Sequence, residues 1–256
     1  MSIIVSVDEK VGIVTFDVPA KKNAFTMEMR GELSHAFDRL GNDDSIRAII
    51  LTGAGHDFCS GADVSEMGGS TTADFLDRMR ALHLAARAIA SVRKPVIAAV
   101  DGVCMGAGWS FALACDLIIA TPQARFSQIF GRIGYAPDAG AIWLLSRLTS
   151  PMRAKEIVYS GRTVGADEAL TLGLVLELAA RETLMARALE MARGFADGPA
   201  LANGMSKQLF SSAQGLTFDQ FLEQEFNVQP LLATTADHRE GLAAFREKRK
   251  PVFTGR

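Results

Sequence analysis

The stretch IILTGAGHDFCSGAD (49–63) joins a short apolar run to a turn rich in glycine and small residues. The stretch VIAAVDGVCMGAGW (96–109) repeats the same pattern. Each predicts a buried strand, a turn without bulky side chains and then a helix. Such turns allow close approach of a ligand, and free N–H groups near a helix N-terminus favour negative charge. We therefore predict an oxyanion hole at the two turns; glycines that merely allow tight packing are the alternative.

The recurrence of strand, glycine turn and helix indicates how the chain is organised. A weaker copy lies around Val14, and the repetition predicts an α/β fold built as a coiled stack of β-β-α units. We expect a helix capped by Thr26 and a buried helix over 139–148. We also expect a helix over 73–90 whose apolar stripe carries His83 together with Leu76, Met79, Ala86 and Ile89. Beyond about Arg181 the pattern is helical, over 181–195, 200–212, 218–232 and 236–249.

Composition restricts the function classes. The 256 residues are 48% hydrophobic, which suffices for a large core, and the net charge of −2 gives no general case for nucleic acid or a membrane surface. Neither a membrane-spanning stretch nor a signal peptide is visible, so we expect a cytoplasmic protein. The cysteines, which are Cys59, Cys104 and Cys115, lack metal-ligand spacing, so reduced thiols and no metal site are expected.

Several further motifs accompany the two turns in a fixed order. They are NAF (23–25), FCSGAD (58–63), KPVIAAVDG (94–102), MGAG (105–108), ACDLIIA (114–120) and AFREKRKPVF (244–253). Together they resemble the crotonase superfamily, the enoyl-CoA hydratase/isomerase proteins, over nearly the whole chain. The resemblance implies a spiral core over 1–195 and a C-terminal helical trimerisation region over 196–256. It also implies an acyl-CoA thioester substrate and a homotrimer or hexamer.

The resemblance assigns residues to the site. The oxyanion-hole donors would be the backbone N–H groups of Ala62 and Ala107. Coenzyme A is part of the substrate rather than a separate cofactor, and the residues expected to bind it are Ala24, Ala62, Asp63, Val64, Phe245 and Lys248. In the family the last two positions reach the coenzyme A of a neighbouring subunit. A solvated basic helix face is the alternative for this end of the chain.

The chain departs from the hydratases of the family at two positions. Their catalytic glutamates would fall at Ser110 and Phe130, and neither residue is a carboxylate. Adding water to a double bond needs a base for the water and an acid for the α-carbon. The ordinary hydratase mechanism is therefore not expected, although a hydratase-type lyase remains an alternative.

Asp138 is an acidic residue at a position that suggests a role, the entry to the apolar helix over 139–148. It is either a helix cap or a general base facing the acyl chain. The overall likeness is greatest to bacterial isomerases of phenylacetate breakdown, which have Pro-Asp at this point. A double-bond shift needs one base, which moves a proton from C2 to C4 while the oxyanion hole holds the dienolate. An enoyl-CoA isomerase is therefore the expected enzyme.

Two other functions stay open. Dehalogenases of chlorobenzoyl-CoA carry an aspartate and a histidine at the positions of Asp138 and His83, but a tryptophan where this chain has Phe130. A non-catalytic acyl-CoA binder is also allowed. His83 itself is either catalytic or a core residue. The glycine-rich segment 64–72 is either a mobile loop beside the pocket or an ordered surface loop.

Overall fold

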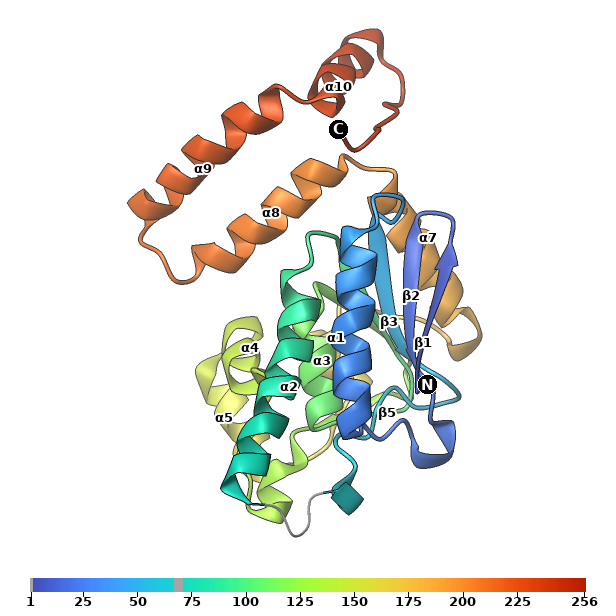
Figure 1. The fold of residues 1–256 in the computed structure, drawn as a ribbon, viewed down its shortest axis with the longest axis vertical. Helices are drawn as coiled ribbons and strands as arrows, with labels where there is room; N and C mark the ends of the chain where they lie inside the picture. Colours follow the sequence, from blue (N-terminus) through green and yellow to red (C-terminus); the bar gives the residue numbers. More distant parts are fainter. Residues whose placement is uncertain (1, 67–70) are drawn as a thin grey trace.

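The computed structural model describes residues 2–66 and 71–256, and a twisted sheet forms its centre (Figure 1). Within these residues the sheet has the strand order β1-β2-β3-β4-β6-β9. The strands are β1 (Ile3–Asp8), β2 (Val11–Phe16), β3 (Ala48–Gly53), β4 (Val96–Val100), β6 (Leu117–Ala120) and β9 (Glu177–Leu178). The hairpin β1–β2 is antiparallel, and every later pair is parallel.

A second, smaller sheet stands beside the first. It consists of β5 (Val103–Met105), β7 (Arg125–Ser127) and β8 (Val164–Gly165), in the order β5-β7-β8. Strand β4 is followed by β5 and a helix, and β6 by β7 and further helices, so the chain coils through both sheets. This arrangement confirms the predicted spiral of β-β-α units.

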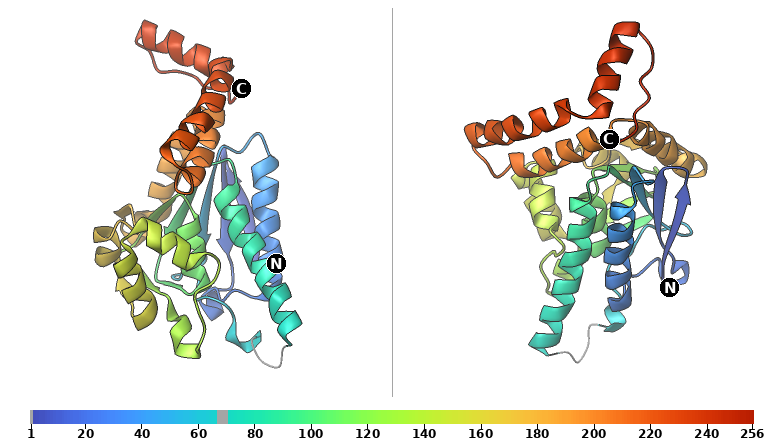
Figure 2. Two further views of the ribbon diagram at one scale, coloured as in Figure 1. Left: turned by 90° about the vertical axis from the view of Figure 1, so that its left-hand side faces the viewer. Right: turned by 45° about the horizontal axis from the view of Figure 1, so that its top comes forward.

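Helices cover both faces of the large sheet (Figures 1 and 2). On one face lie α1 (Met27–Asn42), α2 (Thr72–Ser91) and α3 (Ala107–Ala114), and on the other lies α7 (Leu184–Ala196). Strand β3 shows why both layers form: Ile49 and Leu51 belong to the core under α1–α3, whereas Ile50 packs with α7. Consecutive apolar residues on a parallel strand point to opposite faces, so a strand covered on both sides must be apolar throughout.

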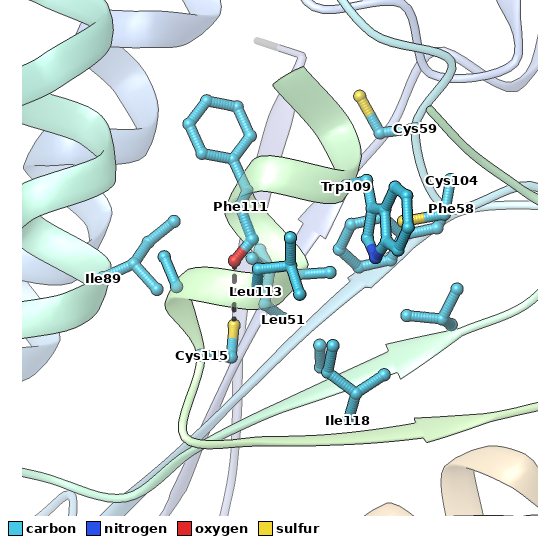
Figure 3. Close-up of a cluster of buried hydrophobic side chains, with 14 of the residues drawn as sticks. Leu51, Phe58, Cys59, Ile89, Cys104, Trp109, Phe111, Leu113, Cys115 and Ile118 are labelled. Atoms are coloured by element: carbon cyan, nitrogen blue, oxygen red, sulfur yellow. Dashed lines mark hydrogen bonds between the residues drawn. The ribbon is translucent and has the colours of Figure 1, made fainter. Parts of the chain in front are cut away.

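Helix α3 is the centre of the larger core (Figure 3). All of its residues are buried, and the ring of Trp109 lies 5.5 Å from that of Phe126. The thiol of Cys115 donates to the carbonyl of Phe111. The described chain contains no disulfide, and all three thiols are buried and free. A helix this deeply buried fixes the position of its own N-terminal turn.

The N-terminal caps agree with the sequence. The hydroxyl of Thr26 accepts from the N–H of Met29 at 3.3 Å, which begins α1 as predicted. Helix α2 also forms, and its predicted apolar stripe is confirmed in part: Ile89 is buried and Met79 and Ala86 pack against the core, whereas Leu76 is 54% exposed. The apolar spacing along α2 does not show which part of the helix the core covers.

A second correction concerns α4 (Ala141–Leu148), which was expected to be buried. Ala141 and Leu145 are buried, whereas Ile142, Trp143 and Leu148 are each about half exposed. Helix α4 packs on α3 and on α5 (Pro151–Ser160), which cover one side of it only. The short helix α6 (Ala166–Thr171) follows.

The remaining helices extend away from the sheet (Figures 1 and 2). They are α8 (Ala200–Ala213), α9 (Phe218–Ala233) and α10 (Ala236–Glu247), which confirm the predicted helical end of the chain. Helices α8 and α9 pack on each other as a hairpin, and α9 has no buried residue. The predicted boundary between 195 and 196 stays a prediction.

Candidate functional site

The two glycine-rich turns lie against each other. Cys59 and Cys104 form a parallel bridge, and the N–H of Met105 donates to the carbonyl of Cys59 at 2.9 Å. A Cβ on Gly108 would lie 2.5 Å from the same carbonyl oxygen, and one on Gly61 would lie 3.0 Å from the oxygen of Met105. Only glycine allows backbones to come this close. The glycines therefore serve tight packing, and this packing also sets the two turns side by side.

The backbone N–H groups of Ala62 and Ala107 come from these two turns. Ala107 is the first residue of α3, and the Gly106 before it has φ 53°. Ala62 follows Gly61, which has φ 98°, and pairs with Phe25 in a parallel bridge. Within the described residues neither N–H donates a hydrogen bond to the protein. Two backbone donors in adjacent turns can together bind one oxygen that gains negative charge.

The predicted coenzyme A residues around the first turn do lie together. Ala24 precedes Phe25, whose N–H donates to the carbonyl of Gly61 at 2.7 Å. Val64 is 68% exposed. Asp63 is buried, and its carboxylate accepts from the hydroxyl of Ser65 and from the ammonium of Lys21 at 2.9 Å.

The two partners of Asp63 define its role. The Ser65 hydroxyl, followed by the Lys21 ammonium, lowers the pKa of Asp63 to about 2. This carboxylate therefore holds the turn Val64–Glu66 on the loop that carries Lys21. The rest of the segment predicted as a loop, 67–70, lies outside the described residues.

The two positions predicted to match the hydratase glutamates hold side chains without acid–base capacity. Ser110 is fully buried in α3, and its hydroxyl donates to the carbonyl of Gly106 at 3.1 Å. Phe130 is 7% exposed, and its ring lies within 3.7 Å of the place where a Cβ of Gly106 would stand. Phe130 therefore puts an apolar ring beside the second turn.

Asp138 and His83 line one open pocket of about 480 Å³. The other residues of its wall are Met79, Gly134, Tyr135, Ala136, Pro137, Ala139 and Gly140. His83 is exposed on α2, so the interpretation of this histidine as a core residue is wrong. The loop with Asp138 begins at Phe130, since the N–H of Tyr135 donates to the Phe130 carbonyl at 3.0 Å. The pocket is thus tied to the two turns through Phe130.

The side chain of Asp138 does not cap a helix. Gly140 is the N-cap of α4, and no side chain accepts a hydrogen bond there. The Oδ1 atom of Asp138 is buried and has no hydrogen-bond partner in the described structure. Burial raises the pKa of Asp138 to about 6, against a smaller lowering by the Arg30 guanidinium. A carboxyl group with a pKa near neutrality can take up and release protons at physiological pH.

Arg30 is a residue near the site that no pattern in the sequence singled out. It lies in α1 and is 8% exposed, although arginine is rarely so buried without a partner. Arg30 directly follows Met29, which is a core residue. A charged residue next to a core position usually faces solvent, so this position did not indicate that Arg30 is buried. Burial lowers its pKa, while the charges of Glu66 and Asp138 raise it.

Phe245 and Lys248 lie apart from this pocket. Helix α10 is reached only beyond the α8–α9 hairpin, away from the loop with Asp138 (Figures 1 and 2). Phe245 is 85% exposed, and Lys248 caps α10 in a left-handed conformation with φ 56°. One copy of the chain does not bring these two residues to the turns.

The described residues contain neither a membrane-spanning helix nor a candidate metal site. None of the helices within 2–66 and 71–256 is long and apolar enough to span a membrane. Nor do these residues contain a cluster of three or more metal-ligating side chains.

Known proteins resemble this chain over nearly its whole length. The family model described as enoyl-CoA hydratase/isomerase matches residues 6–256. The chain is 36% identical to 1,2-epoxyphenylacetyl-CoA isomerase of Escherichia coli K12, over 98% of this chain and 97% of that protein. It is 34% identical to 2,3-dehydroadipyl-CoA hydratase of the same strain, over 99% of both. The structure of a putative enoyl-CoA hydratase from Streptomyces coelicolor A3(2) superposes with a TM-score of 0.96 at 37% identity, covering 100% of this chain and 95% of that one.

Proposed function

The chain belongs to the enoyl-CoA hydratase/isomerase family, and we propose that it is a double-bond isomerase of enoyl-CoA thioesters. One observation carries the proposal. The pocket holds one carboxyl group, that of Asp138, whose pKa is raised to about 6, while Ser110 and Phe130 stand at the positions of the hydratase glutamates. One base is enough for a double-bond shift, and it is too few for the ordinary addition of water.

The mechanism follows from the positions of the groups. The N–H groups of Ala62 and Ala107 bind the thioester oxygen and stabilise the negative charge that develops there. The ionised Asp138 removes a proton from C2 of a 3-enoyl-CoA, and the electron pair passes into the dienolate. The protonated Asp138 then returns the proton to C4, which leaves the double bond between C2 and C3. Phe130 keeps water away from the acyl group.

The names of the relatives support this choice in part. One similar protein is named an isomerase of 1,2-epoxyphenylacetyl-CoA, and another a hydratase of 2,3-dehydroadipyl-CoA. The acid–base residues of the present chain favour the first kind of chemistry. We further propose that the active form is a trimer or hexamer, in which Phe245 and Lys248 of one subunit reach the coenzyme A of another.

The decisive test is Asp138→Asn. The amide keeps the size of the side chain but cannot take up a proton, so isomerisation of a 3-enoyl-CoA should fall by at least about 10². Coenzyme A affinity, measured by calorimetry, should be unchanged. Unchanged turnover in a folded variant would refute the role of Asp138 as base.

A second candidate function uses the same carboxylate as a nucleophile. It is favoured by one observation, that His83 lines the pocket with Asp138. In a dehalogenase-like reaction Asp138 would displace a leaving group from an aryl-CoA and form a covalent ester. Mass spectrometry of the protein after incubation with halogenated aryl-CoA distinguishes the two. A stable adduct on Asp138 that accumulates in His83→Gln would establish the nucleophile; the isomerase predicts no adduct and only a mild effect of His83→Gln.

A further inference from the structure

A buried arginine stands close enough to Asp138 to act on its charge. The guanidinium of Arg30 donates from one terminal nitrogen to the sulfur of Met27 and to the backbone carbonyl of Arg78, the latter at 3.3 Å. Its Nε atom is buried without a hydrogen-bond partner, and within the described residues no carboxylate lies in ion-pair distance of it. An arginine stays protonated under all ordinary conditions. The fold thus keeps an almost fully buried positive charge that no direct ion pair neutralises.

Such a charge is costly. An ion removed from water loses several kcal/mol of solvation unless partners compensate it, so an apolar residue in α1 would serve the core better. The two hydrogen bonds above, one to a sulfur and one to a backbone carbonyl, are weak compensation. No ion pair explains why Arg30 is buried. The remaining explanation is the effect of its positive charge on nearby ionisable groups.

The charged groups around Arg30 and Asp138 come from several elements. Arg30 of α1 interacts with Glu66 and Asp138, and Arg78 of α2 repels it. Asp138 shares its pocket with His83 of α2 and with Tyr135 of its own loop. Arg30 is the cation that lowers the pKa of Asp138, against burial, which raises it. Within the described residues the Oδ1 of Asp138 and the Nε of Arg30 are both buried and unpartnered. The Arg78 carbonyl to which Arg30 donates directly precedes Met79, which lines the pocket together with Asp138.

We propose that Arg30 is a positioning residue for Asp138, whose buried positive charge keeps the carboxylate ionised and ready to accept a proton. This role rests on the proposed function, because only a base must be ionised before it reacts. Arg30 does not line the pocket, so it acts through Asp138 and not on the acyl group. Burial gives Asp138 basicity, and Arg30 prevents burial from protonating it at neutral pH.

The test measures the ionisation of Asp138 directly. Carboxyl-labelled aspartate allows titration by ¹³C NMR, and comparison with Asp138→Asn assigns the signal. Arg30→Gln should move the midpoint of Asp138 upward by about one pH unit, the low end of what loss of an opposite charge does. Arg30→Met removes the same charge with an apolar chain, and such replacements of buried charges are often neutral or stabilising, so a folded charge-free variant is expected. Arg30→Lys retains the charge and should leave the midpoint close to wild type.

The rate profile gives a second readout. In Arg30→Gln and Arg30→Met the acid limb of kcat/KM for isomerisation should shift upward with the NMR midpoint, while the rate at high pH stays near wild type. A purely structural role of Arg30 would lower the rate equally at every pH. Arg78→Gln is the matched control, since it removes an arginine of the same α1–α2 contact that does not act on the pKa of Asp138.

The outcomes separate the two proposals. An Asp138 midpoint that is equal in wild type, Arg30→Gln and Arg30→Met would overturn the role of Arg30, whatever the reaction is. A wild-type protein without isomerase activity would overturn the proposed function, while the NMR titration would still decide whether Arg30 controls Asp138. A shift of equal size in Arg78→Gln would also count against Arg30, because it would show a general effect of charge.

Discussion

The acid–base chemistry of Asp138 is set by its surroundings in the fold. Its residue type and its place before an apolar helix indicated either a cap or a base, and both were possible because aspartate suits both. The environment decides between them. Gly140 takes the cap position, and burial of Oδ1 raises the pKa of Asp138 to about 6. Neither the burial of Asp138 nor the nearby charge of Arg30 could be inferred from the spacing of the sequence, since both depend on how the loop and the helices come together around the pocket.

The raised pKa has a consequence for stability. The pKa of Asp138 is about 6 in the fold against 3.8 for the unperturbed group, so the unfolded chain releases this proton more readily. The stability due to protonated Asp138 is therefore complete below about pH 4 and is lost as the pH rises through 6. Asp138→Asn should be more stable than wild type by about 3 kcal/mol at pH 8 and by less than about 1 kcal/mol at pH 4. Urea unfolding at both pH values tests this; an equal difference at pH 4 and pH 8 would contradict it.

Ser110 and Phe130 make a separate prediction about the reaction. Neither side chain can act as acid or base, and the Phe130 ring occupies the space beside Gly106. Crotonyl-CoA should therefore not be hydrated at ordinary enzyme rates, which are roughly 1–10³ per second. The decrease of enoyl absorbance gives the rate, with a bacterial hydratase as the positive control. Hydration at such rates would show that another residue supplies the missing acid and base.

At the scale of elements, the strands and helices agree with the sequence where one local signal decides them. Thr26 caps α1, and the continuous apolar run of β4 becomes a strand buried on both faces. The errors arise where burial depends on distant partners. In α2 the predicted stripe includes the exposed Leu76, and in α4 three large apolar residues stay half exposed. Periodicity identifies the helix but not the segments that later cover it.

The contact between the two glycine turns can be tested with Gly108→Ala. The added Cβ would meet the carbonyl oxygen of Cys59 at 2.5 Å and the Cys59 Cβ at 2.7 Å, so the first turn of α3 must move. This displaces the N–H of Ala107 relative to that of Ala62. We expect a loss of about 10² in kcat, as for removal of one oxyanion donor, and a loss of about 1–3 kcal/mol in stability from overpacking.

Gly194→Ala is the control for this change. Gly194 lies within α7 with nothing near the site of the new Cβ, so alanine should stabilise the helix by about 1 kcal/mol. Activity assays and denaturant unfolding measure both variants. Full activity of Gly108→Ala would show that the spacing of the two turns is not needed for catalysis.

At the scale of the whole molecule, the C-terminal helices cannot be explained by one copy of the chain. Their large exposed side chains include Phe210, Phe218, Phe226 and Phe245, each at least 74% exposed. A monomer rarely exposes so much aromatic surface on one region, so a partner surface is expected. The apolar faces of these helices could be predicted from the sequence, but packing on the chain's own core was an equally open alternative. The extended arrangement of α8 and α9 favours packing between subunits (Figure 2).

Assembly and coenzyme A binding are predicted to fail together. Wild type should sediment as a trimer or hexamer, and Phe226→Glu should yield smaller species, because it places a charge on the aromatic surface. Asn227→Glu, at an exposed neighbouring position of α9, adds the same charge and should not change the assembly.

In the assembled protein Lys248→Asn should weaken coenzyme A binding about tenfold, because one charge-assisted hydrogen bond is lost. Asparagine is chosen because it tolerates the left-handed conformation found at this position. Lys250→Asn is the control of equal charge. When Lys248→Asn is combined with Phe226→Glu, it should not lower the affinity for coenzyme A any further, because the lysine then has no neighbouring subunit to reach. A tenfold loss that persists in the smaller species would instead place Lys248 in the site of its own chain.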